Sequence, residues 1–157
     1  MIKKTNAVRI LERLDISFSL KEFKIDQFDL SAERAAELME VPLERVFKTL
    51  VARGDKNGVI VASIPGGDQL DLKALAKISA NKKVEMVPLK EVEKLTGYIR
   101  GSVSPLGIKH HYPFYLDSSY SGYATIIISA GMPGLQVEIN PHELAAATGA
   151  LIGNIAK

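Results

Sequence analysis

Two apolar segments joined by a tight turn constrain the fold of this chain most strongly. Residues 46–52 and 59–64 each read as a buried strand, and residues 54–58 (GDKNG) between them are typical of a hairpin turn. One residue breaks the apolar pattern: side chains alternate along a strand, so Lys48 shares a face with apolar neighbours. A desolvated ammonium is costly unless it is paired or hydrogen-bonded. Lys48 is therefore either a functional cation or a side chain whose stem extends to water from an edge strand.

Helix and strand signals follow one another along the rest of the chain. Helices are expected behind the capping side chains Thr5, Ser31, Asp71 and Asn140, and from Pro88 to Lys94 with Gly97 at the C-terminal end. Further strands are expected at residues 16–23, 84–87, 114–116, 124–129 and 135–139, with residues 130–134 as a turn. Because strands cluster after helices instead of alternating with them, we expect one α+β domain over residues 1–157. Its sheet should be curved, mixed and mostly antiparallel, with helices on its flanks.

The composition limits the classes to which the chain can belong. Its 157 residues are 46% hydrophobic and 24% charged, which is ordinary for a globular domain. The absence of cysteine excludes disulfides, thiolate nucleophiles and zinc–thiolate sites, and fits a cytoplasmic location. No apolar run reaches the roughly 18 to 20 residues that span a bilayer, and residues 1–5 lead into an amphipathic pattern without a signal-peptide core. We expect a cytoplasmic protein with no membrane partner.

A glycine- and serine-rich segment, residues 101–107 (GSVSPLG), is suited to present backbone N–H groups to a ligand. Ser102 and Ser104 do not lie in a strand–nucleophile–helix elbow, so the pattern gives no support to a serine nucleophile. Serines in such loops form turns or donate hydrogen bonds to ligands. Adjacent histidines on a strand point to opposite faces, so His110 and His111 cannot readily share one metal ion. We expect neither a metal nor a cofactor.

The net charge of +2 permits a nucleic-acid partner without requiring one. Several basic residues could bracket a phosphate backbone: Lys82, Lys83, Arg100, Lys109 and His110. An ordinary solvated surface also explains these residues, and the sequence favours this explanation over phosphate binding.

Six segments, taken in order, resemble the bacterial YbaK/EbsC family. They are residues 47–50 (FKTL), 69–73 (QLDLK), 82–86 (KKVEM), 96–98 (TGY), 101–107 (GSVSPLG), and 128–131 (ISAG) followed by Gly134 and Leu135. This family is the Cys-tRNA(Pro) deacylase group, which is related to the editing domain of bacterial prolyl-tRNA synthetases. The resemblance implies an α+β editing domain that cleaves the ester of a mischarged aminoacyl-tRNA in trans.

The resemblance also implies the site. Lys48 matches the family's functional lysine, and Gly101 begins the Gly-x-x-x-Pro loop whose backbone holds the aminoacyl ester and terminal adenosine. The loop residues Ser102, Val103, Ser104 and Pro105 are implied as substrate-binding, as are Thr49 and Ser129. The implied partners are the 3′ end of a mischarged tRNA and prolyl-tRNA synthetase. In Cys-specific members the substrate thiol is thought to attack its own ester, which makes the enzyme a lyase; attack by water makes it a hydrolase.

Two positions depart from the Cys-specific pattern. Gln136 stands where those members have an acidic residue that could hold the substrate ammonium, and Glu138, two residues along the same strand face, is a possible substitute. Phe23 stands where a tyrosine is typical. These departures leave Ala and Ser open as alternatives, and Cys remains the expected ester because a thiol carried by the substrate tolerates imprecise placement better than a water does. A non-catalytic module that binds tRNA or synthetase, and an amino-acid sensor, are alternatives of other classes; Lys48 and the intact Gly101 loop favour the enzyme.

Overall fold

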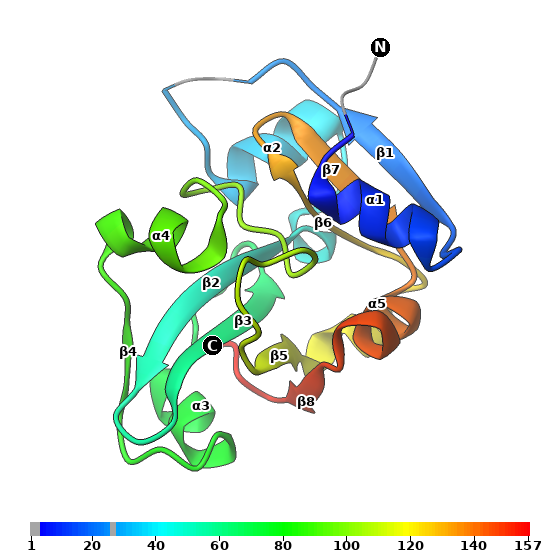
Figure 1. Ribbon diagram of the computed structural model, residues 1–157. Coiled ribbons are helices and arrows are strands. Elements are labelled where there is room, and N and C mark those ends of the chain that lie inside the picture. The colour runs from blue at the N-terminus through cyan, green and yellow to red at the C-terminus, as the bar shows by residue number, and fades with distance from the viewer. Residues whose placement is uncertain (1–3, 26–27) are drawn as a thin grey trace.

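The computed structural model describes residues 4–25 and 28–157, whose strands form two sheets (Figure 1). The smaller sheet is antiparallel and has the order β1-β7-β6, with β1 (Phe18–Glu22), β7 (Leu135–Ile139) and β6 (Ile126–Met132). The larger sheet has the order β4-β2-β3-β5-β8. Its hairpin β2 (Phe47–Gly54) and β3 (Gly58–Pro65) is antiparallel, as is β4 (Val84–Met86), whereas β5 (Phe114–Asp117) and β8 (Leu151–Gly153) run parallel to their neighbours.

Four of the helices in the described residues begin at the capping residues that the sequence indicates. The helices are α1 (Asn6–Arg13), α2 (Ala32–Met39), α3 (Leu72–Ile78), α4 (Val92–Thr96) and α5 (Pro141–Thr148). Thr5, Ser31, Asp71 and Asn140 each accept a hydrogen bond from a backbone N–H of the first turn, which satisfies one of the donors left free at a helix start. Short 3₁₀ turns lie at Leu43–Arg45, Leu89–Glu91 and Ser118–Gly122.

Aliphatic side chains form the core in layers. Helix α1 packs through Ala7, Val8 and Leu11 against the inner face of the smaller sheet, in a cluster that also includes Leu144 of α5. Helix α3 covers the β2–β3 hairpin in a second cluster through Leu75. Figure 1 shows the two helices on separate parts of the molecule, with the loop after α4 crossing in front of the hairpin.

The α+β prediction is confirmed, with differences in detail. The strands divide into two sheets, whereas one was expected. The segment expected as a helix from Pro88 begins with a 3₁₀ turn, and α4 itself starts at Val92. Strand β6 continues to Met132 through a register shift after Ser129, so the following turn is shorter than expected, and strand β8 was not foreseen. No helix in the described residues is long and apolar enough to cross a bilayer.

One feature of the larger sheet positions the site: half of β2 has a partner strand on only one side. Strand β3 pairs with β2 along its length, but β4 pairs only with Ala52–Gly54. At the other end, Val46 forms a bridge with Ile127 of β6 on the side opposite β3. Within the described residues, the edge of β2 at residues 47–50 therefore carries no strand between β6 and β4. Lys48 lies on this open stretch.

Candidate active site

A cleft of about 680 Å³ lies along the open edge of β2. Strand β2 forms its floor, and its walls come from the segment before α2, from β4 and the turn after it, and from the loop after α4. Its lining includes the predicted site residues Lys48, Thr49, Gly101, Val103, Ser129 and Gln136. Segments as far apart in the chain as Phe28 and Gln136 thus meet at one cavity.

Lys48 is half-buried in the cleft floor. Its ammonium forms no ion pair or hydrogen bond within the described part of the chain, although acidic side chains pair with lysines elsewhere. A partly desolvated cation without a protein partner is suited to bind an anionic ligand or a developing negative charge. Arg100, an exposed residue at the mouth, adds a second positive charge to the lining.

The loop that starts at Gly101 contributes Gly101 and Val103 to the cleft that Lys48 also lines. Gly101 has a φ of +84°, in the left-handed region that favours glycine. The Ser102 N–H donates to the Ile99 carbonyl at 3.0 Å, which closes the turn. The N–H groups of Gly101 and Val103 form no hydrogen bond with any described residue, so both remain available as donors at the cleft.

Two hydroxyl groups near Lys48 are already used within the protein. Ser129 Oγ donates to the Ser102 carbonyl at 2.9 Å and accepts from the Gly131 N–H at 3.0 Å, which ties the loop to β6. Thr49 Oγ1 lies 2.7 Å from Ser63 Oγ on β3, and either hydroxyl can donate. Ser129 and Thr49 therefore contribute shape and loop position to the cleft, and neither has a base beside it that would make it a nucleophile.

A small recess of about 30 Å³ opens beside the cleft and shares six lining residues with it. The shared residues are Asp29, Leu30, Ser31, Ala35, Gly101 and Gln136. Its other lining residues are mostly apolar, with Phe23, Leu38, Met132 and Pro133 among them, and also include Arg34 and Ser102. The predicted residues Phe23 and Ser102 thus lie at the recess, whereas Lys48 lies in the cleft.

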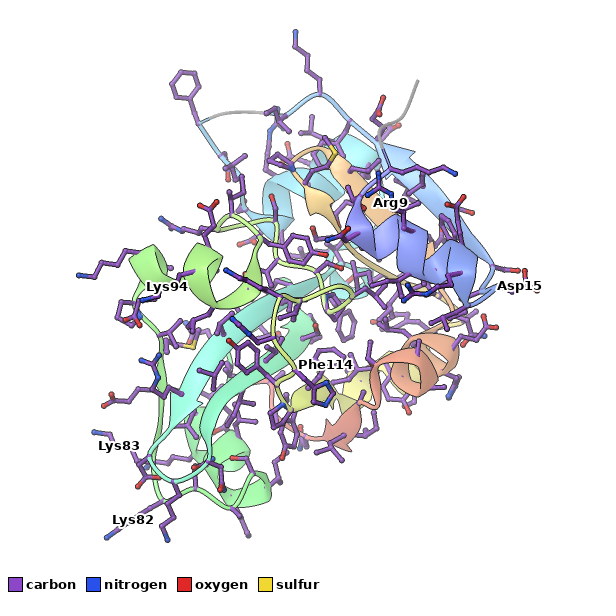
Figure 2. The ribbon with its side chains drawn as sticks, in the orientation of Figure 1. Arg9, Asp15, Lys82, Lys83, Lys94 and Phe114 are labelled. Carbon is purple, nitrogen blue, oxygen red and sulfur yellow. The ribbon has the colours of Figure 1, made fainter. Side chains whose placement is uncertain are left out.

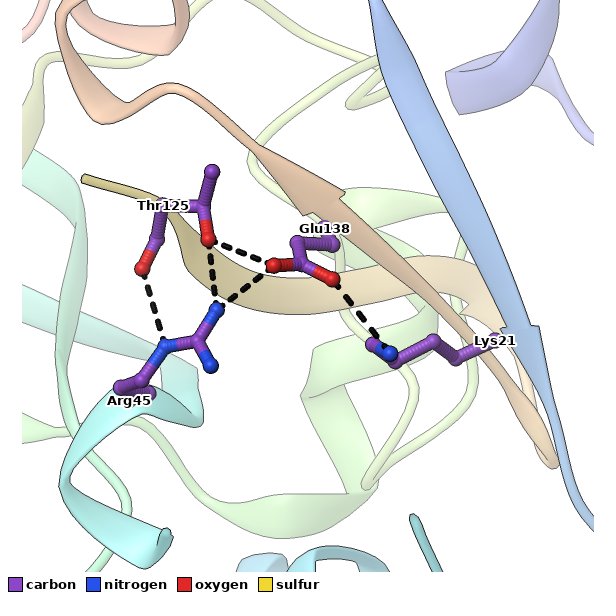
Figure 3. Close-up of polar contacts among 4 residues, drawn as sticks. All are labelled: Lys21, Arg45, Thr125 and Glu138. Atoms are coloured by element: carbon purple, nitrogen blue, oxygen red, sulfur yellow. Dashed lines mark hydrogen bonds and ion pairs between the residues drawn. The ribbon is translucent and has the colours of Figure 1, made fainter. Parts of the chain in front are cut away.

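The suggestion that Glu138 serves the substrate ammonium is wrong, because other side chains occupy its carboxylate (Figure 3). Arg45 lies 2.7 Å from it, Lys21 lies 3.3 Å away, and Thr125 Oγ1 donates to it at 2.6 Å. The hydrogen bond from Thr125, with those from Arg45 and Lys21, lowers the pKa of Glu138 to about 2 against the opposing effect of desolvation. Glu138 lines neither the cleft nor the recess. The network joins β7 to β1 and to the turn before β2.

Two of the predicted loop residues lie behind the cleft surface. Ser104 is fully buried, and its Oγ accepts from the Leu106 N–H at 3.2 Å, as expected for a turn-forming serine. Pro105 is also buried. Neither lines the cavities, so their contribution is to hold the loop backbone. Asp29, which lines both cavities, was not indicated by the sequence, because its irregular, exposed segment carries no periodic signal.

The basic pair Lys82 and Lys83 does not belong to the cleft. Figure 2 shows both side chains projecting to solvent at the tip of the β2–β3 hairpin. Their backbone N–H groups donate to Asp55 in the hairpin turn, at 3.0 and 3.1 Å. At about 3.3 Å per residue along a strand, this turn lies roughly 20 Å from Lys48. His110 and His111 are exposed, and the described residues contain no group of three His, Asp or Glu side chains placed to hold a metal ion.

Comparison with known proteins identifies the family. The sequence profile named "Aminoacyl-tRNA editing domain" matches residues 30–147, which include every cleft residue except Phe28 and Asp29. The chain belongs to the aminoacyl-tRNA editing domain family. Within this family, the chain is 47% identical to a protein of Enterococcus faecalis named "Putative Cys-tRNA(Pro)/Cys-tRNA(Cys) deacylase EbsC", over 93% of this chain and 89% of that protein.

Two further similar proteins are a solved structure of about the same length and a segment of a larger protein. A solved structure described as "a putative trans-editing enzyme for prolyl tRNA synthetase" superimposes with a TM-score of 0.83 at 25% identity, and the match covers 99% of both chains. A proline–tRNA ligase from a Sulfurihydrogenibium species is 31% identical over 64% of this chain, which corresponds to 17% of the ligase. The editing fold thus occurs both as a separate chain and as part of a synthetase.

Proposed function

We propose that this protein is an aminoacyl-tRNA deacylase that acts in trans and cleaves the ester of a mischarged tRNA, foremost Cys-tRNA(Pro). One observation carries the proposal: Lys48, Gly101 and Val103 line the same cleft, and neither the Lys48 ammonium nor the N–H groups of Gly101 and Val103 have a hydrogen-bond partner among the described residues. The 3′ end of an aminoacyl-tRNA brings a phosphate and an ester carbonyl, and both are stabilised by cations and convergent N–H donors. The name of the Enterococcus relative supports the same reaction.

The cleft supplies electrostatic stabilisation and leaves the attacking atom to the substrate or to water. Among its described lining residues, the hydroxyls of Thr49 and Ser129 are engaged, and no histidine or cysteine is present. With a cysteinyl ester, the substrate thiol sulfur attacks the ester carbonyl carbon, and the carbon–oxygen bond to the ribose breaks. The thiol proton passes to the ribose oxygen, which leaves a thiolactone and tRNA with a free hydroxyl. The N–H groups at Gly101 and Val103 stabilise the oxyanion of this step.

The recess supports a substrate with a small side chain. Its volume of about 30 Å³ suits a small group such as a thiol or a methyl, and apolar lining residues such as Phe23, Leu38 and Met132 favour these groups over a hydroxyl. Cysteine is preferred to alanine because an attacking group within the substrate already has a high effective molarity, whereas attack on an alanyl ester needs a separately positioned water.

The test compares initial deacylation rates on Cys-tRNA(Pro), Ala-tRNA(Pro), Ser-tRNA(Pro) and Pro-tRNA(Pro), with and without prolyl-tRNA synthetase. We expect the cysteinyl ester to be cleaved fastest, with the thiolactone as first product, and the prolyl ester to be spared. Free cysteine as first product would show hydrolysis. A faster rate on the alanyl ester would overturn the Cys assignment and leave the deacylase intact. Failure on all four esters, with and without synthetase, would refute the enzyme and favour a non-catalytic accessory module.

A further inference from the structure

We propose that the Asp29 carboxylate binds the α-ammonium of the aminoacyl ester, an inference that rests on the proposed function. Among the described residues that line the cleft and the recess, Asp29 is the one carboxylate, and it lines both cavities. An α-ammonium is a cation that needs a charged or strongly polar acceptor when it leaves water. Asp29 therefore supplies a negative charge, which no other described lining residue carries.

The position of Asp29 matches the covalent structure of the substrate. In an aminoacyl ester, the α-carbon carries the ammonium and joins the carbonyl to the side chain. When the carbonyl lies at the Gly101 N–H in the cleft and the side chain enters the recess, the ammonium lies where the two cavities meet. Asp29, Gly101 and Gln136 all line this junction. Gln136 adds a neutral amide oxygen, so Asp29 provides the negative charge.

The Asp29 carboxylate is held in place and ionised. Its Oδ1 accepts from the Ser31 N–H at 3.0 Å. Hydrogen bonds from the Ser31 side chain and backbone, with a smaller contribution from the Arg34 charge, lower the pKa of Asp29 below its ordinary value. Arg34, also in the recess lining, places its guanidinium 2.9 Å from Glu37, so that its charge is shared with a carboxylate outside the cavities.

The test uses non-hydrolysable ligands, so that binding is measured apart from turnover. The probe is 3′-deoxy-3′-(cysteinylamino)adenosine, and its N-acetyl derivative lacks the ammonium charge. The variant Asp29→Asn keeps an oxygen for the Ser31 N–H and removes only the charge. We expect the wild type to bind the free amine at least about tenfold more tightly than the acetylated ligand, the lower range for a charge-assisted hydrogen bond. Asp29→Asn should reduce this preference to near unity.

Two further variants separate a binding role from a structural one. Glu33→Gln removes an exposed carboxylate from the first turn of α2, outside both cavities, and should keep the wild-type preference. Asp29→Glu keeps the negative charge on a longer side chain and should show part of the wild-type preference for the free amine. An unchanged preference in Asp29→Asn, a wild type that does not distinguish the two ligands, or a wild type that binds neither would overturn the proposal. Ammonium-dependent binding without cleavage of any charged tRNA would refute the deacylase and leave the role of Asp29 intact.

Discussion

Replacing Lys48 by methionine tests whether the cleft acts through a fixed positive charge. Methionine keeps the length and most of the volume of the lysine stem and removes the ammonium. Because Lys48 has no ion pair or hydrogen bond within the described residues, the substitution leaves no acidic partner behind in the protein. The effects on folding and on activity should therefore separate clearly.

Folding should be unharmed. Breaking a buried ion pair is strongly destabilising because it leaves an uncompensated charge, and Lys48 forms no such pair with any residue that the structure describes. Lys48 is half-buried. The substitution should therefore lower the free energy of unfolding by no more than about 0.5 kcal/mol, and the apolar thioether favours a small increase instead. For a chain of this size, this corresponds to a melting-temperature shift of at most about 2 °C.

Activity should fall much further. Loss of one donor to a transition-state oxyanion typically costs about 100- to 1,000-fold in kcat. We expect at least the lower figure for Lys48→Met on Cys-tRNA(Pro). Arg100 remains at the mouth of the cleft to attract phosphate, so the loss should appear mainly in kcat and less in KM. Arginine cannot reproduce a compact ammonium at this site, so Lys48→Arg should recover only part of the rate.

The assay is single-turnover deacylation of Cys-tRNA(Pro) with enzyme in excess, together with thermal unfolding of each variant. Lys73→Met, on the exposed side of α3, is the matched control for loss of one lysine charge and should keep the wild-type rate. Full activity of Lys48→Met would refute the reasoning. An equal loss in Lys73→Met would show that net charge alone, acting on tRNA affinity, causes the effect.

Two further predictions address the loop and the ion network. Gly101→Val should abolish turnover, because a β-branched residue opposes the φ of +84°. The melting temperature should change little, because Gly101 is itself exposed and a Cβ there meets no atom closer than Leu30 Cβ at 3.8 Å. Ser102→Ala should cost much less activity, and equal loss in both variants, by the same assay, would require a hydroxyl mechanism. The lowered pKa of Glu138, about 2 against an ordinary 4.5, contributes stability that is complete above about pH 4.5 and is lost as the pH falls toward 2, with an upper limit of about 3 kcal/mol. Glu138→Gln should therefore be less stable at pH 7 and lose this part of the acid dependence, as measured by urea unfolding at pH 7, 4 and 3; the same acid dependence in the variant would show that other groups cause it.

The features of the fold that the sequence predicts correctly depend on residues close together in the chain. A helix cap needs a side chain and an N–H two or three residues later, as at Ser31 and Asn140. The hairpin turn is equally local. The division into two sheets depends on distant pairings such as Phe18 with Ile139, and β8 has only three residues that pair with a strand 36 positions earlier. No short pattern encodes such pairings.

The same distinction separates the candidate site residues that the sequence indicates from the candidate that only the structure indicates. Lys48 stands out because it interrupts an apolar strand, and Gly101 because it begins a loop rich in glycine. Glu138 has the right spacing from Gln136, but Arg45 and Lys21, from two other elements, hold its carboxylate. Asp29 is an exposed polar residue in an irregular segment, and only the three-dimensional arrangement brings it to the junction of the two cavities.

On the proposed function, the distribution of charge indicates which part of tRNA recognition the cleft leaves to another protein. On the proposed function, the cleft needs to stabilise only the 3′ end of the tRNA, and it does so with Lys48, Arg100 and two backbone N–H groups. The basic pair Lys82 and Lys83 lies roughly 20 Å away at the hairpin tip, and the net charge is only +2. Tight, salt-dependent binding of a nucleic acid requires many phosphate contacts. The body of the tRNA must then be selected elsewhere, and a synthetase that already holds the tRNA would supply that selection. On this argument, prolyl-tRNA synthetase should lower the KM for Cys-tRNA(Pro) and leave the chemical step at Lys48 unchanged.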